Sequence, residues 1–215
     1  MERIICLAIG YVFGMFQTSY IIGKAHHMDI RQYGSGNAGT TNALRTLGKK
    51  AGAMTLIGDM LKCVIAILIV DAVFKNQYQE ILPLLGMYTA AGCVLGHNFP
   101  FYLGFRGGKG IAASAGMLLA MDWRVFLICA VIFIGLVAIT RYVSLGSMAA
   151  YAGALVCFIG FGAAGNYGMD FSHTVEMDVI MGLMTALAIY RHRANIYRLL
   201  NGTENKLGAA KTAAK

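Results

Sequence analysis

Residues 51–70 read AGAMTLIGDMLKCVIAILIV, and this stretch decides the fold class. An α-helix rises about 1.5 Å per residue, so about twenty apolar residues cross the roughly 30 Å hydrocarbon core of a bilayer. Of the 215 residues, 58% are hydrophobic and only 13% are charged, against about 25% charged in soluble domains. The sequence therefore predicts an all-α polytopic membrane protein. About seven transmembrane helices are expected from the apolar runs 4–23, 51–70, 81–96, 111–121, 125–140, 145–165 and 177–190.

The distribution of basic residues predicts the orientation. With seven crossings and the N-terminus outside, fourteen of the eighteen Lys and Arg residues fall on one side. They lie in segments 24–50, 97–110, 141–144 and 191–215. Cytoplasmic loops carry the excess of Lys and Arg, so this side is expected to be cytoplasmic, with the C-terminus on it. If the short run 111–121 did not cross, the basic C-terminal segment would lie outside.

Residues 1–206 are expected to form a single transmembrane domain, followed by a disordered basic tail over 207–215. The leader before the first run is hardly basic, so this run is predicted to be an uncleaved helix. Asp59 and Lys62 share one helix face and are expected to pair, because a lone charge at mid-bilayer costs about 3 kcal/mol. A structural ion pair is favoured here over a substrate contact. The five scattered cysteines indicate neither a zinc site nor a disulfide framework.

The first cytoplasmic loop contains YGSGNAGTTNALR at residues 33–45. Glycines let backbone N–H groups face an anion, and an arginine can bind phosphate through two parallel hydrogen bonds. A flexible turn would explain the glycines, but not the hydroxyl and amide donors together with Arg45. The loop lacks the Gly-Lys-Ser/Thr ending of a Walker A motif. It is interpreted as a phosphate site, with donors from Ser35, Thr40, Thr41 and Asn42.

The second loop reads GHNFPFYLGFRGGKG at residues 96–110 and leads directly into the run 111–121. A glycine-rich lead-in to a helix N-terminus is suited to bind an anion, and Lys109 adds positive charge. A GGKG sequence alone is a weak motif, but its position beside a membrane strengthens it. His97 could act as a general acid or base, or donate to phosphate. A single interfacial histidine in a structural role is the alternative.

Two further polar stretches are RYVSLGS at 141–147 and HRANIYRLLNGTENK at 192–206. His192 and Asn195 share a helix face. A basic surface helix would explain the arginines of the second stretch, but not Asn195 or Glu204. His173 and Asp178 form a His-x4-Asp pattern, the catalytic motif of one class of glycerolipid acyltransferases. It falls on the outer face and is interpreted as chance.

Three segments, at 34–45, 96–110 and 192–206, closely resemble the cytoplasmic motifs of the bacterial acyl-phosphate:glycerol-3-phosphate acyltransferases. The segments 59–62 and 141–144 are also similar, and Arg106 stands where Lys is common in the family. The resemblance implies an enzyme of the bacterial cytoplasmic (inner) membrane with its active site on the cytoplasmic face. It would move a fatty acyl group from acyl phosphate to the 1-hydroxyl of sn-glycerol 3-phosphate, giving lysophosphatidic acid and inorganic phosphate. No metal or cofactor and no nucleic-acid partner are expected; membrane lipids surround a monomer.

The motifs and the resemblance together assign roles to individual residues. Catalytic roles are expected for Ser35, Arg45, His97, His192 and Asn195. Substrate or phosphate binding is expected for Gly34, Gly36, Asn37, Thr41, Asn42, Gly107, Gly108, Lys109, Gly110 and Ser144. Structural roles are expected for Asp59, Lys62 and Glu204.

Three questions stay open at this level. The glycerol hydroxyl could attack the acyl phosphate directly, with a donor phosphate oxygen or His97 taking the proton, or an acyl-Ser35 intermediate could form. Which loop holds which phosphate, and the preferred acyl chain, are undetermined. A transporter of a small phosphorylated compound is the alternative from another class, although no internal repeat supports it.

Overall fold

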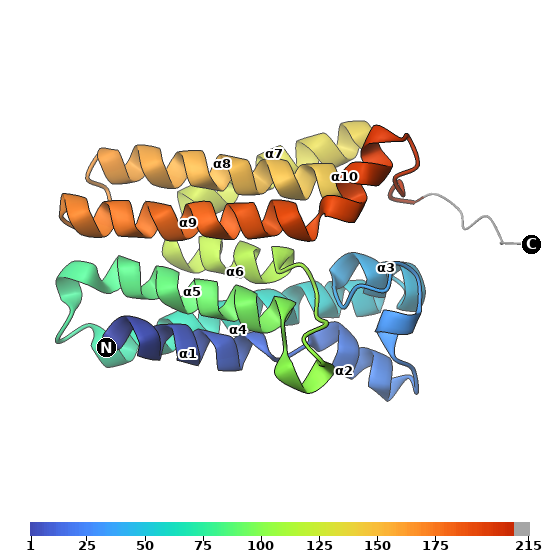
Figure 1. The fold of residues 1–215 in the computed structure, drawn as a ribbon, viewed down its shortest axis with the longest axis horizontal. Coiled ribbons are helices and arrows are strands. Elements are labelled where there is room, and N and C mark those ends of the chain that lie inside the picture. Colours follow the sequence, from blue (N-terminus) through green and yellow to red (C-terminus); the bar gives the residue numbers. More distant parts are fainter. Residues whose placement is uncertain (209–215) are drawn as a thin grey trace, which may run out of the picture.

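The computed structural model describes residues 1–208, which form helices and loops without any β-strand. The longer helices run side by side along the long axis of the molecule (Figure 1). The α-helices are α1 (Glu2–Gly14), α2 (Thr18–Ala25), α3 (Thr40–Leu47), α4 (Lys49–Phe74), α5 (Leu82–Asn98), α6 (Ile111–Met121), α7 (Trp123–Thr140), α8 (Val143–Ala163), α9 (Phe171–Arg191) and α10 (Arg193–Leu200). Short 3-10 helices are η1 (Ile30–Gln32), η2 (Gln79–Ile81) and η3 (Phe101–Leu103). Most of the expected tail, residues 209–215, lies outside the described residues.

The helices follow the apolar runs of the sequence, which confirms the all-α membrane class. Six of the seven expected segments correspond to α4 through α9, and 111–121 matches α6 residue for residue. By length and composition, four stretches could each cross a membrane: Glu2–Ala25, Lys49–Phe74, Trp123–Thr140 and Val143–Ala163. The polar loops between helices add α3 and α10, two short helices at the same end of the molecule (Figure 1).

The first expected segment is not one continuous helix, and this part of the prediction is wrong. The chain leaves the helical conformation at Gln17 (φ −100°, ψ 89°), which separates α1 from α2. The buried Gln17 side chain donates from Nε2 to the carbonyl of His97 at 2.9 Å. The freed carbonyl of Phe16 accepts a hydrogen bond from Lys62. The break is stabilised by these tertiary contacts, because neither proline nor glycine stands at residues 15–17.

Helix α5 is the most buried helix, and glycines allow α1 to approach it closely. A Cβ atom on Gly10 would lie 1.9 Å from the carbonyl oxygen of Thr89, and one on Gly14 would lie 2.1 Å from that of Cys93. The reverse contacts are equally close: Gly92 faces the Leu7 carbonyl and Gly96 that of Tyr11. Each helix thus presents a Gly-xxx-Gly pair, the pattern that lets membrane helix backbones touch. This packing places His97, the residue after Gly96, against the end of α1.

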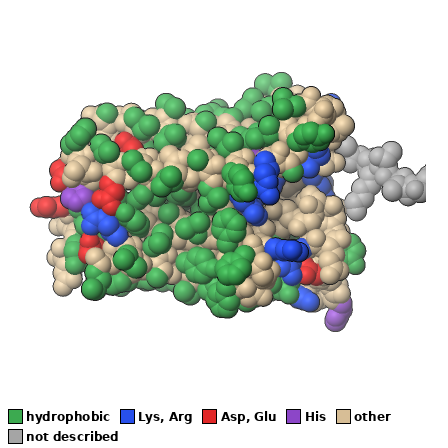
Figure 2. Space-filling view, viewed as in Figure 1, with side chains coloured by type: hydrophobic (Ala, Val, Ile, Leu, Met, Phe, Trp, Pro, Cys, Tyr) green, Lys and Arg blue, Asp and Glu red, His purple; other side chains and the backbone are tan. Residues whose placement is uncertain are grey.

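The surface separates into an apolar belt and two charged ends. Apolar side chains cover the middle of the long axis (Figure 2), and apolar residues such as Val131 and Ile139 on α7 are exposed. Lys and Arg gather at the end that holds α3 and α10, whereas Asp and Glu are concentrated at the end that holds the N-terminus (Figure 2). This is the distribution expected of a protein that spans a bilayer with its basic end in the cytoplasm.

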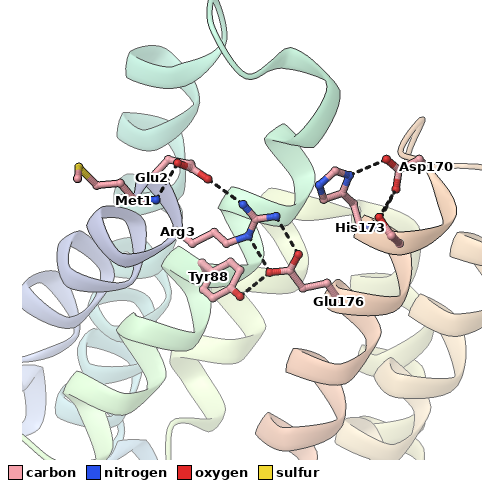
Figure 3. A network of polar contacts seen from close by, with 8 residues as sticks. Met1, Glu2, Arg3, Tyr88, Asp170, His173 and Glu176 are labelled. Atoms are coloured by element: carbon pink, nitrogen blue, oxygen red, sulfur yellow. Dashed lines mark hydrogen bonds and ion pairs between the residues drawn. The ribbon is translucent and has the colours of Figure 1, made fainter.

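A polar network ties α1, α5 and α9 together at the N-terminal end (Figure 3). Arg3 donates to the two carboxylate oxygens of Glu176 at 2.7 and 2.9 Å, and Tyr88 donates to the same carboxylate at 2.6 Å. In the same view, His173 contacts Asp170 at 2.9 Å. His173 therefore has a local partner one turn away, at the opposite end from α3 and α10.

Replacing Glu176 by Gln is expected to lower stability without changing chemistry. The change removes the negative charge that pairs with Arg3. It also places an amide N–H₂ group, itself a donor, against the donors of Arg3 and Tyr88. Partly exposed ion pairs contribute about 0.2–1 kcal/mol, so a loss on the order of 1 kcal/mol is expected. Thermal unfolding in detergent measures it. The matched control is Asp170→Asn, whose exposed carboxylate bonds only within its own helix turn; an equal shift in both variants would contradict a role for the interhelix network.

Candidate active site

A cavity of about 1210 Å³ opens among the loops at the basic end and continues between α6, α7 and α8. All four polar segments of the sequence reach it. The expected site residues that line it are Ser35, Gly36, Asn37, Thr41, Asn42, Arg45, Asp59, His97, Gly107, Lys109, Gly110, Ser144, His192, Asn195 and Glu204. Gly34, Gly108 and Lys62 do not line it; they pack against residues that do. The structure thus joins segments separated by up to 170 residues.

Asn42 shapes the first loop, where its amide already has partners. Its Oδ1 accepts from the backbone N–H of Ser35 at 2.8 Å, and its Nδ2 donates to the carbonyls of Ile30 and Tyr33, both at 3.0 Å. Both amide hydrogens are therefore used within the loop. Gly34 (φ +61°) fits this arrangement because a Cβ there would lie 2.3 Å from Asn42 Oδ1. The side chain of Asn42 thus holds the loop in place.

The donors that stay available in the first loop lie at the start of α3. Gly39 is the N-cap, and it has no side chain to satisfy the first N–H groups of the helix. Thr40 adds a buried hydroxyl that has no partner within the described residues. Unpaired N–H groups at a helix N-terminus favour an anion. One turn further along α3, Arg45 is half-buried, lines the cavity and donates to the carbonyl of Asn205 at 3.2 Å.

The second loop is held by backbone hydrogen bonds to the end of α5 and by an arginine from α9. The N–H groups of Gly107 and Gly108 donate to the carbonyls of Asn98 and His97, each at 3.1 Å. Arg191 donates to the Gly108 carbonyl at 2.7 Å. These bonds hold the loop beside the cavity, which Lys109 lines. Arg191 was not singled out in the sequence for this role.

A second arginine fixes the same loop nearer the surface. Arg31 donates to the carbonyl of Leu103 at 2.9 Å and pairs with Asp29 at 2.7 Å. Like Arg191, it was not singled out in the sequence. Both arginines bind backbone carbonyls of a distant segment, and such contacts have no sequence pattern.

Lys62 joins Asp59 and His97 in a buried group beneath the loops. Its ammonium contacts Asp59 Oδ1 at 2.9 Å and His97 Nδ1 at 2.8 Å, and it donates to the Phe16 carbonyl. The expected ion pair is confirmed. A lysine ammonium only donates, so Nδ1 of His97 accepts and the ring hydrogen sits on Nε2. His97 therefore carries a hydrogen-bond donor at Nε2, beside Gly108, and the alternative role as a base is not favoured.

His192 has the opposite arrangement. Its Nδ1 lies 2.7 Å from the carbonyl of Ala188, an acceptor, so Nδ1 carries the hydrogen and Nε2 keeps its lone pair. Burial, with the nearby charge of Lys109, lowers the pKa of His192 to about 4. The ring is neutral at physiological pH and offers an acceptor at the cavity wall.

Glu204 connects the third and fourth polar segments. Its carboxylate accepts from Ser144 at 2.9 Å, from Asn195 at 2.7 Å and from Arg198 at 2.7 Å. Burial alone would raise the pKa of Glu204, but these donors outweigh it and hold the pKa below its usual value. Lys109 extends the network by donating to Asn195 Oδ1. Ser144 and Asn195 thus have protein partners, and their expected contacts with substrate are secondary to positioning.

Replacing Glu204 by Gln is expected to destabilise this end of the protein. The amide would turn an N–H₂ group toward a donor, and each buried donor left unsatisfied costs about 1–3 kcal/mol. Thermal unfolding and activity per folded molecule measure the effect. The double variant Glu204→Gln/Arg198→Gln is expected to recover part of the stability, because the arginine charge is removed as well. Glu80→Gln, an exposed position at the other end, serves as the control; an equal loss there would rule out the network as the cause.

The remaining apolar half of the cavity lies between helices. It is lined by Leu118, Phe126, Cys129, Phe133, Ala150 and Ala154. A polar, cationic mouth joined to an apolar interior fits a ligand with a phosphate at one end and a hydrocarbon chain at the other. Within residues 1–208, no cluster of three His, Cys, Asp or Glu side chains could hold a metal ion.

A sequence model described as glycerol-3-phosphate acyltransferase matches residues 4–202. The chain belongs to the glycerol-3-phosphate acyltransferase family. It is 48% identical to a glycerol-3-phosphate acyltransferase of Clostridioides difficile, over 97% of each chain. A Lactiplantibacillus plantarum relative of the same name is 41% identical, over 95% of this chain and 92% of the relative.

Solved structures of an integral membrane glycerol 3-phosphate acyltransferase are similar to this family member. The glycerol 3-phosphate form has a TM-score of 0.82 at 34% identity, covering 97% of this chain and 96% of that one. The lysophosphatidic acid form has a TM-score of 0.79 at the same identity and coverage. The resemblance seen in the three motifs is therefore confirmed. The transporter alternative finds no support among these relatives.

Proposed function

We propose that this acyltransferase takes its acyl group from an acyl phosphate and transfers it to the 1-hydroxyl of sn-glycerol 3-phosphate. The observation that carries the proposal is the single cavity in which a cationic mouth adjoins an apolar interior. Both substrates carry phosphate, and two groups of donors face the mouth: the start of α3 with Arg45, and the glycine loop with Lys109. The acyl chain would lie between α6, α7 and α8.

We further propose that the chain crosses the membrane seven times, with its N-terminus outside. The basic end that holds α3 and α10 would face the cytoplasm of a bacterium, where soluble glycerol 3-phosphate meets an acyl donor dissolved in the cytoplasmic membrane. Helix α6 is short for a full crossing, but its burial against α4 and α5 supports a crossing within the protein interior. The cavity is complete within one chain, which supports a monomer.

Direct attack of the glycerol hydroxyl on the acyl carbonyl is the mechanism that the geometry favours. An acyl-Ser35 intermediate would need a base beside the hydroxyl, and no described residue forms a hydrogen bond with Ser35 Oγ. Acyl phosphate is already activated, so positioning and charge stabilisation supply most of the catalysis. The hydroxyl proton would pass to an oxygen of the leaving phosphate, with Nε2 of His192 as the second acceptor.

Release of inorganic phosphate by the purified protein in detergent tests the proposed function. Phosphate should appear only when acyl phosphate and glycerol 3-phosphate are both present, in a 1:1 ratio with lysophosphatidic acid. Acyl coenzyme A in place of acyl phosphate should give no product. Turnover with the coenzyme thioester alone would contradict the proposed donor, and acyl-enzyme trapped without acceptor would contradict direct attack.

The lowered pKa of Lys109 predicts that glycerol 3-phosphate binding depends on pH. Burial lowers the pKa of Lys109 to about 8, against the attraction of Glu204. The ammonium is charged below this value and neutral above it, so kcat/KM for glycerol 3-phosphate should fall as pH rises through about 8. The variant Lys109→Arg should move the fall to higher pH, because guanidinium stays charged. An unchanged profile in this variant would show that another group titrates.

A further inference from the structure

Ser114 on α6 and Tyr151 on α8 form a buried hydroxyl pair inside the cavity. Ser114 lies on the first turn of α6, where its N–H donates to the carbonyl of Gly110 at 2.8 Å. Tyr151 lines the cavity from the same face of α8 as Ser144 and Ser147. The pair therefore lies one helical turn beyond the glycine loop, at the boundary between the cationic mouth and the apolar interior.

The pair holds one more hydrogen than its mutual bond uses. Two hydroxyls carry two hydrogens, and one hydrogen bond between them consumes one. Buried hydroxyls on α5, α8 and α9 donate to the carbonyl four residues earlier: Thr89 to Leu85, Ser147 to Val143 and Thr185 to Met181. Ser114 makes no such bond with Gly110, and within residues 1–208 no third group accepts from either hydroxyl.

A free O–H in this position is available to an acceptor on a ligand. A hydroxyl without a partner in an apolar environment costs about 1–3 kcal/mol by mutational measures. The hydrocarbon chain of an acyl donor has no acceptor, and its phosphate would sit among the cationic groups at the mouth. The carbonyl oxygen between phosphate and chain is the acceptor that would fall at this boundary.

We propose that the Ser114–Tyr151 pair donates its free O–H to the carbonyl oxygen of the acyl donor and stabilises the negative charge that develops there. The inference rests on the proposed function. As the glycerol oxygen bonds to the carbonyl carbon, the C=O π electrons move onto this oxygen, where the O–H stabilises them. The electrons then return, the bond from carbon to the phosphate oxygen breaks, and phosphate leaves with that electron pair and the hydroxyl proton. Acyl phosphate and alcohol thus become ester and inorganic phosphate, with no other reactant.

The test compares wild type with Ser114→Ala, Tyr151→Phe and the double variant, using palmitoyl phosphate at saturation. Loss of one donor to a developing oxyanion costs about 10²–10³ in kcat, so the double variant should lose about this much. KM for glycerol 3-phosphate should change by less than about twofold. Each single variant should lose less, because the remaining hydroxyl still donates. Ser147→Ala is the matched control: this hydroxyl faces the same cavity but donates to a backbone carbonyl, so kcat should be retained.

Two measurements separate this role from a purely structural bond between α6 and α8. An alkyl phosphate of the same length has no carbonyl, so it should inhibit the double variant and wild type equally. A double variant that keeps wild-type kcat, even with a lower Tm, would overturn the inference. If it does not fold, Ser114→Cys/Tyr151→Phe preserves the volume and should show the same loss. Wild-type protein that releases no phosphate would instead contradict the proposed function.

Discussion

Gly108→Ala is expected to reduce kcat by at least about 100-fold, since a displacement of about 1 Å in a catalytic site can cost this much. A Cβ atom on Gly108 would lie 2.1 Å from Nε2 of His97 and 2.5 Å from the carbonyl oxygen of Ala38. His97 cannot move aside, because Lys62 and the packing of α5 hold it. The glycine loop must therefore shift, and Lys109 shifts with it.

The same loop offers a matched control. Gly104 has a positive φ of +63°, but a Cβ there would meet no atom within 4 Å. Gly104→Ala should therefore cost about 1–2 kcal/mol of local strain and leave most of the activity. Steady-state kinetics of both variants, normalised to folded protein, measure the difference. If Gly104→Ala lost as much activity as Gly108→Ala, general loosening of the loop would explain both, and the specific contact with His97 would not.

Arg45→Ala is expected to lower kcat by about 10²–10³, the usual cost of losing one donor to a developing anion. Arg45 lines the cavity mouth and has one described hydrogen bond, to the Asn205 carbonyl, so most of its donors face the site. Burial lowers the pKa of Arg45, but a guanidinium stays charged across the physiological range. Its fixed fork is suited to hold the departing phosphate.

Chemical rescue distinguishes this role from a structural one. Guanidinium ions added to Arg45→Ala should restore part of the activity, because the vacated volume is open to the cavity. Arg45→Lys keeps the positive charge but should recover only part of the activity, because an ammonium cannot form two parallel hydrogen bonds with phosphate. Rapid quench with acyl phosphate would show whether the lost step is acyl transfer. Normal kinetics in Arg45→Ala would place the phosphate elsewhere.

The predictable part of the fold is the part governed by local composition. Six of seven apolar runs became helices near their expected bounds, since a helix satisfies every backbone group within itself and membrane spans need this. The interruption between α1 and α2 was not predictable. It depends on hydrogen bonds with His97 and Lys62, which lie far along the chain, whereas residues 15–17 contain no proline or glycine to mark a break.

The candidate site shows the same division. Ser35, Arg45 and Lys109 were selected because phosphate binding needs particular residue types near glycines and helix ends. His192 and Asn195 were selected through the family resemblance, and all five residues line one cavity. Asn42 was selected for its residue type as well, but its amide donates to a backbone carbonyl of the first loop. Arg191 was not selected, although it holds the glycine loop, because its partners are the backbone carbonyls of a segment more than 80 residues away.

The sequence by itself determined the membrane class, the positions of six long helices, the basic end and the family, because apolar length, charge and motif residues are local properties. Only the tertiary structure decided which donors are free. The amino-acid sequence shows that a hydroxyl, amide or imidazole is present, but not whether its hydrogen bonds are made within the protein or are open to a ligand. The tautomers of His97 and His192, the internal role of Asn42 and the spare hydrogen of Ser114 and Tyr151 all follow from partners that folding brings within 3 Å.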